Sequence, residues 1–300
     1  MDIYRAKKNI NKLIRTLLII LLLGWTLGPI YWVVSTSFKQ LHEIQSYPPT
    51  FISKEPRIRN YKAIFGLASR EELTDMEKVS PTHSEAGFTV YTVYIRNSLL
   101  AAGLTTIIVI PIGVLGAYAL DRFSIKRKKD IKFWILSQRM IPPIAIIIPL
   151  YLLLARIRLI DTVFGLMVAY TTMTLPFAVW MLASYFAEIP KELDEAAFLD
   201  GCSRFQVLIR IIIPVVAPCI AAAAVLSFMF CWNEFIAALM LTYTEKAQTV
   251  AVALSTFKGS KGVAYGQMAA LTTISMIPII VLVLLVQKYM VRGLTFGAVK

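Results

Sequence analysis

The charged residues with the most informative spacing lie between two long apolar stretches, in the segment Ile189 to Pro214, which reads IPKELDEAAFLDGCSRFQVLIRIIIP. Pro190 suits the first turn of a helix, where its missing N–H costs no hydrogen bond. The acidic residues after it favour the same helix start, because the helix dipole is positive there. Ala196 and Ala197 continue the helical spacing of apolar residues. The segment therefore predicts a short helix with Pro190 in its first turn.

Gly201 predicts a sharp turn after this helix, because glycine takes the left-handed backbone conformation that branched residues resist. Ser203 and Gln206 are three residues apart, which is the spacing of a capping box that starts a second helix. The residues 189–214 are thus predicted to form a helix–glycine–helix hairpin. A solvated loop with a capped amphipathic helix fits the same residues, and both interpretations stay open at this point.

Polar side chains within apolar stretches are the other candidates for chemistry. Glu234 follows Asn233 near the end of an apolar stretch, and a charge inside a membrane costs about 3 kcal/mol on insertion scales. Glu234 either lines a polar route or anchors the local structure. Thr172 and Thr273 could each bind a solute hydroxyl or a carbonyl one turn back in the same helix. Arg139 could pair with an acid or extend toward lipid headgroups.

Metal, disulfide and nucleotide chemistry find no support in the sequence. His42 and His83 are its only histidines, so a histidine-rich metal site is not expected. The three cysteines are an odd set within or beside apolar stretches and predict no disulfide framework. The chain contains no GxxxxGK[ST] pattern, which would form a phosphate-binding loop. We therefore expect no cofactor, no metal and no ATPase site of its own in this chain.

The composition is typical of a membrane protein. Hydrophobic residues make up 57% of the 300 residues, more than soluble domains use. The net charge of +13 comes mainly from lysine and arginine in short connectors between apolar stretches, as the positive-inside rule expects. Nucleic-acid binding would need those charges on one soluble face. The charge therefore predicts contact with membrane lipid and no nucleic-acid partner.

Six apolar stretches are long enough for membrane-spanning helices, which need about 20 residues each. The basic arm before the first stretch and the basic tail after the last place both termini on the inner side. The first stretch is predicted to be an uncleaved helix, because it is longer than a signal peptide's and ends in Tyr31 and Trp32. The six stretches are residues 17–34, 97–120, 133–155, 163–186, 215–241 and 267–286.

These stretches divide the chain into four predicted parts. Residues 1–36 are a cytoplasmic arm with the first membrane helix, and residues 37–95 are an outer loop with a short helix near Asn60 to Phe65. Residues 96–290 are a core of five membrane helices that contains the hairpin, and residues 291–300 are an inner tail. The expected fold class is therefore all-α and integral to the membrane, with the hairpin on the inner side.

The hairpin resembles the EAA loop of ATP-binding-cassette (ABC) importer permeases, whose pattern is EAA, three residues, Gly, nine residues, I, any residue, L, P. Ile213 stands for the usual leucine, a change between apolar residues of similar volume. The run WNEF at 232–235, the segment IIPLYLLL around Pro149 and the tail RGLTFGAVK are similar to the second, shorter permease of maltose-transporter-type carbohydrate importers. The matching hairpin residues are Glu195, Ala196, Ala197, Gly201, Ile211 and Pro214.

The resemblance implies a methionine-importer-like type I permease core with six transmembrane helices and cytoplasmic termini, in the inner membrane of a prokaryote. It implies a heterodimer with a second permease, two copies of an ATPase that hold ATP and Mg, and an external solute-binding protein that delivers a sugar. Import would then proceed by alternating access. Contact with the ATPase would be made by Glu195, Ala196, Ala197, Asp200 and Gly201, framed by Pro190, Ser203, Ile211 and Pro214.

Other solutes and other classes of protein are alternatives. The outer connectors carry Arg156, Arg158, Lys258 and Lys261, which leaves a polyol, a glycerol phosphate or an anionic oligosaccharide open as the cargo. A channel would more naturally show a symmetric pore motif. A membrane enzyme would place clustered His, Asp or Glu residues at one face, and outside the hairpin the sequence has no such cluster.

Overall fold

The structure is a computed structural model that describes residues 2–65, 67, 87–259 and 262–296. The chain is helical throughout these ranges apart from loops and one antiparallel pair of two-residue strands, β1 (Lys258–Gly259) and β2 (Gly262–Val263). Five helices are long and apolar enough to cross a membrane, and a bent helix pair would make a sixth. The all-α membrane architecture is confirmed. His83 and Lys261 lie outside the described residues.

The described residues pack into two units. One combines residues 1–89 with 256–275, and the other combines residues 90–255 with 276–300. These units reflect packing within the chain, whereas the four parts predicted from the sequence reflect sides of the membrane. The predicted part boundaries therefore stay a prediction.

The first unit joins the outer loop to a helix from each end of the chain. It contains α1 (Asp2–Ser37), α2 (Leu41–Ile44), α3 (Arg59–Ile64) and the start of α14 (Tyr265–Phe296). The helix expected near Asn60 is α3, and its buried Asn60 donates hydrogen bonds to the carbonyls of Ser37 (2.8 Å) and Lys39 (3.1 Å). A Cβ at Gly266 would lie 2.6 Å from the Asn60 amide nitrogen. Only glycine therefore allows this close approach between α3 and α14.

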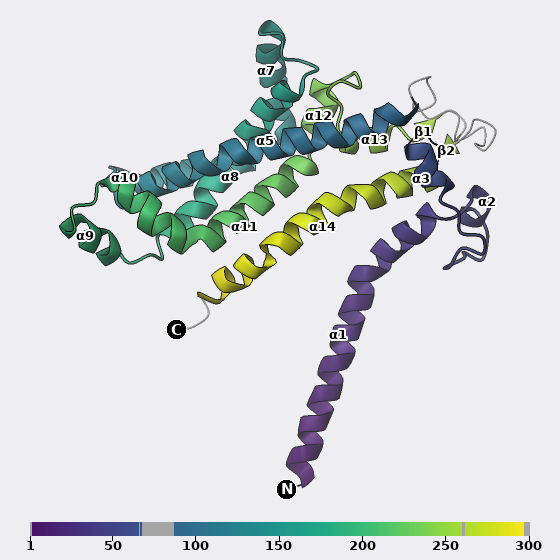
Figure 1. Ribbon diagram of the computed structural model, residues 1–300, viewed down its shortest axis with the longest axis horizontal. Helices are drawn as coiled ribbons and strands as arrows, with labels where there is room; N and C mark the ends of the chain where they lie inside the picture. Colours follow the sequence, from purple (N-terminus) through teal and green to yellow (C-terminus); the bar gives the residue numbers. More distant parts are fainter. Residues whose placement is uncertain (1, 66, 68–86, 260–261, 297–300) are drawn as a thin grey trace. The chain divides into compact units, whose positions relative to one another are not determined.

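The second unit is built around α5, α8 and α11. One core cluster gathers side chains such as Leu154, Tyr170 and Trp232, and a second gathers Phe186 and Ile212 with their neighbours. Figure 1 shows α9 and α10 at one end of α8 and α11, and α7 and α12 at the other. Besides the rest of α14, the elements are α5 (Gly87–Arg122), α6 (Lys128–Ser137), η3 (Gln138–Met140), α7 (Pro143–Arg156), α8 (Val163–Phe186), α9 (Glu192–Leu199), α10 (Arg204–Val207), η4 (Leu208–Ile212), α11 (Ile213–Trp232), α12 (Ile236–Leu241) and α13 (Val250–Ser255).

The third predicted span is broken rather than kinked. Helix α6 with η3 covers Lys128–Met140, α7 covers Pro143–Arg156, and the two are bent by 90°. Two adjacent prolines explain the break, because a residue before proline is disfavoured in the α region and proline itself donates no N–H. Pro142 accordingly has ψ of 131°, outside the helical range.

The fifth predicted span, residues 215–241, is wrong at both ends. Its helix runs on from the hairpin through α10 and a π-helical turn, η4, and ends at Trp232. Proline has no N–H for the carbonyl four residues earlier, and the wide π turn lies at that place before Pro214. Helix α12 begins after a three-residue break, where the Glu234 carboxylate accepts hydrogen bonds from the amides of Ala237 (2.8 Å) and Ala238 (3.2 Å).

Side chains that bind main-chain groups join the ends of α5, α8 and α12 that the sequence predicts to lie on the outer side of the membrane. Asp161 accepts hydrogen bonds from the amides of Tyr243 and Thr244, both 3.0 Å, and its own amide donates to the Leu241 carbonyl. Asn97 of α5 donates to the carbonyls of residues 245 and 248, and the Ser98 hydroxyl accepts from the Val250 amide. We call this set the outer clamp; it fixes the loop that follows α12.

Candidate functional site

The segment predicted as a hairpin has this structure. Helix α9 ends before Gly201, whose φ of +80° is the left-handed conformation that the turn requires. The predicted capping box is present, because the Ser203 hydroxyl accepts from the Gln206 amide and the Gln206 side chain accepts from the Ser203 amide at 2.8 Å. One prediction is wrong in detail: Pro190 precedes α9, whose N-cap is Lys191, instead of lying in its first turn.

One face of the hairpin is buried against the membrane helices. Asp194 and Ala197 are three residues apart on α9, and both are buried. Together with Ile189 and Val207, Ala197 belongs to the core cluster that also contains Phe186 of α8. The hairpin is therefore packed onto the second unit as part of its core.

The opposite face of α9 is exposed and combines acidic with apolar side chains. The predicted contact residues Glu195, Ala196, Asp200 and Gly201 are exposed, whereas Ala197 is not. Beside them Leu199 is 89% exposed, and Leu193 and Phe198 are 41% exposed. Glu195 forms no ion pair with any described residue. None of the described residues covers this surface.

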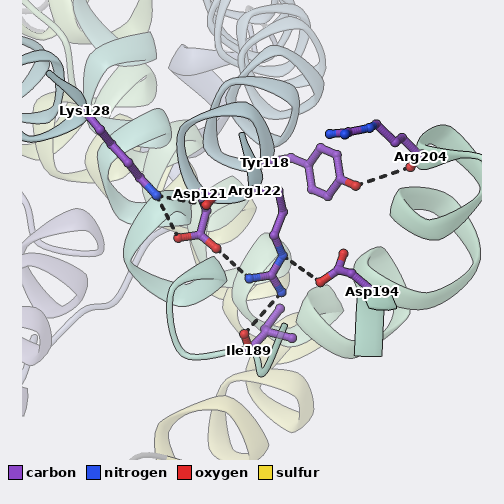
Figure 2. A network of polar contacts seen from close by, with 7 residues as sticks. All are labelled: Tyr118, Asp121, Arg122, Lys128, Ile189, Asp194 and Arg204. Carbon is purple, nitrogen blue, oxygen red and sulfur yellow. Dashed lines mark hydrogen bonds and ion pairs between the residues drawn. The ribbon is translucent and has the colours of Figure 1, made fainter. Parts of the chain in front are cut away.

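Arg122, at the end of α5, connects the hairpin to the neighbouring helices (Figure 2). Its Nη1 lies 2.7 Å from Asp121 Oδ2, its Nη2 donates to the Ile189 carbonyl at 3.2 Å, and its Nε lies 2.8 Å from Asp194 Oδ2. Lys128 of α6 closes the group, because its Nζ lies 3.5 Å from Asp121 Oδ1 and donates to the Asp121 carbonyl at 2.9 Å. We call these four charged residues the inner network.

Arg122, Asp121 and Asp194 of the inner network are buried, whereas the Lys128 side chain is partly exposed, and the burial changes the electrostatics of the group. The side chains of Arg122 and Asp194 are 6% and 7% exposed. Burial raises the pKa of the Asp194 carboxyl, and the adjacent Arg122 guanidinium offsets part of that rise. The Arg122–Asp194 contact is an ion pair without the alignment of a directed hydrogen bond, and Asp194 Oδ1 has no hydrogen-bond partner within the described chain.

A second contact joins α5 to the hairpin beside the inner network. The Tyr118 hydroxyl donates to the Arg204 carbonyl at 3.4 Å, and the Arg204 guanidinium lies 4.8 Å from the ring centre of Phe123. Figure 2 shows Tyr118 reaching from α5 toward the start of α10. The end of α5 therefore touches both helices of the hairpin.

The sequence pattern did not single out Arg122, Asp121 or Asp194 as site residues. A signal was present, because Asp194 shares its helix face with Ala197 at a spacing of three residues. An acid on a buried face requires a cation. The partner itself is far away in sequence, so no local pattern selects Arg122 among the basic residues at and after the end of α5.

The residues predicted for a solute route bind groups of their own helices or of the next one. Asn233 donates to the Met229 carbonyl (2.8 Å), Thr172 to the Val168 carbonyl (3.0 Å) and Thr273 to the Ala269 carbonyl (2.8 Å). Glu234 caps α12. Asn233 and Thr172 are nevertheless exposed, and a role for any of the four in a solute route stays a prediction.

Arg139 lies in η3, directly before the break of the bent helix pair. Its guanidinium carbon is 5.1 Å from the ring centre of Phe177 on α8 and 4.9 Å from that of Phe230 on α11. No acid among the described residues pairs with it. The charge is therefore held against two aromatic rings, an arrangement that neither sequence interpretation included.

No group of three or more His, Cys, Asp or Glu side chains that could hold a metal ion occurs in the described part of the chain. Residues 109–296, which contain the whole hairpin, match the family described as binding-protein-dependent transport system inner membrane component. The chain belongs to this family. It is an ABC permease of the inner membrane, and the family segment holds α9, α10 and every predicted hairpin residue.

Relatives and solved structures agree with this family. The permease is 39% identical to the trehalose/maltose transport system permease protein MalG of Thermococcus litoralis over 208 residues, 69% of this chain and 75% of the relative. It is 34% identical to the trehalose transport system permease protein SugB of Mycobacterium tuberculosis, over 93% of this chain and 94% of the relative. The sugar-permease resemblance read from the sequence is confirmed at the level of the family and its relatives.

Two solved transporters share the fold of this permease. A bacterial ABC transporter involved in the import of the acidic polysaccharide alginate has a TM-score of 0.73 at 20% identity and covers 94% of this chain and 97% of its own. The MetNI methionine ABC transporter has a TM-score of 0.58 at 16% identity and covers 70% of this chain and 99% of its own. The predicted methionine-importer-like permease fold is confirmed.

Proposed function

We propose that this permease is one of two different permease subunits of an ATP-driven importer that moves a sugar or oligosaccharide into the cytoplasm. The observation that carries the proposal is the two-sided hairpin, whose Asp194 face is locked to the membrane helices while its Glu195 face is exposed. The names of the relatives from Thermococcus litoralis and Mycobacterium tuberculosis, which specify trehalose and maltose, support a sugar as cargo.

The exposed face of α9 would dock on an ATPase subunit. Leu199 and Phe198 would enter an apolar groove, and Glu195 and Asp200 would face basic residues at its rim. Because the chain has no phosphate-binding loop, ATP and Mg would bind to the ATPase. Two ATPase copies would serve this permease and its partner permease, and an external solute-binding protein would deliver the sugar.

Transport would proceed by alternating access. ATP binding would close the two ATPase subunits and move the docked hairpins together. The rigid attachment of the hairpin to the second unit would carry this movement into the membrane helices, which would open outward and take the sugar from the binding protein. Hydrolysis would reset the inward-facing state. In this scheme the permease performs no covalent chemistry.

The test is transport by the complete importer in proteoliposomes with its ATPase, partner permease and binding protein. Radiolabelled trehalose and maltose should enter only with ATP inside and binding protein outside. Uptake without ATP would contradict the proposed class of importer. Import of a carboxyl-bearing oligosaccharide, with trehalose and maltose excluded, would rule out these two sugars as the cargo and leave the proposed class of importer intact.

The hairpin is tested in the same vesicles with Gly201→Asp, which places a side chain at φ +80°. We expect the turn to distort, so that ATP hydrolysis persists while uptake falls by about tenfold, a typical allosteric coupling range. Gly103→Ala is the matched control, because an added Cβ there meets nothing within 4 Å. Wild-type uptake and ATPase docking in Gly201→Asp would refute the role of the turn.

A further inference from the structure

We propose that Arg122 is a positioning residue that transmits movement of the hairpin to α5 and α6, with Asp194 as its counterpart on the moving element. This inference rests on the proposed function, because it describes how a movement of α9 caused by an ATPase would reach the membrane helices. Arg122 and Asp194 lie outside the EAA pattern, and their ion pair connects the hairpin that carries the pattern to α5.

Arg122 contacts three separate elements with three different nitrogens: its own helix through Asp121, the chain after α8 through the Ile189 carbonyl, and α9 through Asp194. The guanidinium is planar, so these directions are fixed relative to one another. A shift of α9 that keeps the contact with Asp194 must therefore move the end of α5 as well (Figure 2).

Apolar side chains in the same cluster hold the hairpin through buried area, and the hydrophobic effect behind this contribution is not directional. A buried ion pair behaves differently, since separating the two charges leaves each without a partner in a medium of low dielectric constant. Both side chains are less than one tenth exposed. The pair therefore resists separation more strongly than the packing around it.

Lys128 connects the end of α5 to α6. Lys128 holds Asp121 from the first turn of α6, at 3.5 Å from the carboxylate and 2.9 Å from the carbonyl. Helix α6 leads into the 90° break before α7. Movement received by Arg122 would thus reach the broken helix pair of the second unit. The hydrogen bond from Tyr118 to the Arg204 carbonyl holds the second helix of the hairpin, α10, against α5.

The experiment measures the number of sugar molecules imported per ATP hydrolysed by the reconstituted importer. In Asp194→Asn the complex should assemble and hydrolyse ATP, while the transport ratio falls by about tenfold. Arg122→Lys keeps the charge but replaces the planar guanidinium with a compact ammonium, which does not fix the directions of its three partners, so its ratio should lie between the wild-type and Asp194→Asn values. Asp130→Asn, which removes an exposed acid from the first turn of α6, is the control and should keep the wild-type ratio.

A purely structural role predicts a different result, namely parallel losses of assembly, hydrolysis and uptake with an unchanged ratio, and that result would overturn the inference. If Asp194→Asn does not fold, the double variant Arg122→Met/Asp194→Leu removes both buried charges and should fold, because apolar pairs replace buried ion pairs well. Its ratio should still be low, and a wild-type ratio would refute the joint. If wild-type vesicles show no ATP-driven import, the proposed function fails instead.

Discussion

The two ends of the second unit hold their loops with carboxylates in different ways. In the outer clamp, Asp161 binds main-chain amides of residues 243 and 244, so it fixes the backbone conformation of one loop. In the inner network, Asp194 meets the Arg122 side chain of another helix, so it joins two elements without fixing the backbone of either. The carboxylate at the outer end therefore fixes the conformation of a loop, whereas the carboxylate at the inner end connects two helices.

The largest expected effect would break the inner network itself. Arg122→Met leaves Asp121 and Asp194 buried without their shared cation, and we expect it to lower the free energy of unfolding by about 4 kcal/mol, as loss of one partner of a buried pair does. Thermal unfolding in detergent measures the change. Lys129→Met, which removes an exposed cation nearby, should change stability by less than about 0.5 kcal/mol. Equal effects of the two variants would mean that the network adds no stability.

The next effect would break the outer end by crowding. A Cβ on Gly165 would lie 2.1 Å from the Leu159 carbonyl oxygen, a backbone atom that cannot move aside cheaply. Gly165→Ala should therefore cost about 3 kcal/mol of stability. Gly103→Ala should be neutral or stabilise by about 1 kcal/mol, because the site is open and alanine favours helix. Similar unfolding temperatures for the two variants would contradict the tight turn.

An intermediate loss of stability is expected from Asp161→Asn, which removes the charge of the side chain and keeps its shape. Asn tolerates the positive φ of 58° at this position, but it loses charge-assisted hydrogen bonds, so Asp161→Asn should cost about 2 kcal/mol at neutral pH. Stability measured by thermal unfolding at several pH values tests this effect.

The pH dependence follows from the sign of the shift. Burial acts to raise the pKa of Asp161, but hydrogen bonds from the Thr244 hydroxyl and from the amides of Thr244 and Tyr243 outweigh it, so the pKa is lowered. A lowered carboxyl pKa stabilises the fold above the unfolded value and loses this effect as pH falls through the folded value. The advantage of wild type over Asp161→Asn should be full at neutral pH and shrink below about pH 4. An advantage that grows in acid would refute this assignment.

The smallest effect sharpens the comparison, because both ends also use neutral helix caps. The Thr162 hydroxyl accepts from the Gly165 amide at 3.0 Å, and the Ser203 hydroxyl accepts from the Gln206 amide at 3.4 Å. Thr162→Ala and Ser203→Ala should each cost about 1 kcal/mol. Only Ser203→Ala is expected to lower the transport ratio as well. A drop in the transport ratio of Thr162→Ala would show that the outer end also transmits the movement of the hairpin.

The helical parts of the fold were predictable where a local rule decides them. Span four was placed at its observed bounds, Gly201 was predicted to turn, and Ser203 was predicted to cap. Each of these depends on residues within a few positions. The end of α11 at Trp232 was missed, because the apolar pattern continues through it and only the Glu234 cap shows that a new helix begins.

The inner network was not predictable, for a physical reason. Its central ion pair joins residues 122 and 194, and a basic connector offers several cations of equal sequence character. Which of them meets the acid depends on where α5 ends relative to α9 after packing. The sequence therefore predicts that a buried acid needs a partner, and tertiary structure selects the partner.

The π-helical turn before Pro214 determines how the orientation of the hairpin responds to a change in the number of residues. Such a turn holds one residue more than an α-helical turn, and each residue of an α-helix rotates the chain by about 100°. Deleting one residue from the segment 208–212 would therefore close the wide turn into a regular one and leave the orientation of the hairpin about α11 nearly unchanged. Deleting one residue from α11 beyond Pro214, where no wide turn can absorb the loss, would instead turn the hairpin by about that angle relative to the rest of α11. The π turn is thus the place in this helix, among the described residues, where the chain can lose one residue and still keep Glu195 on the exposed face.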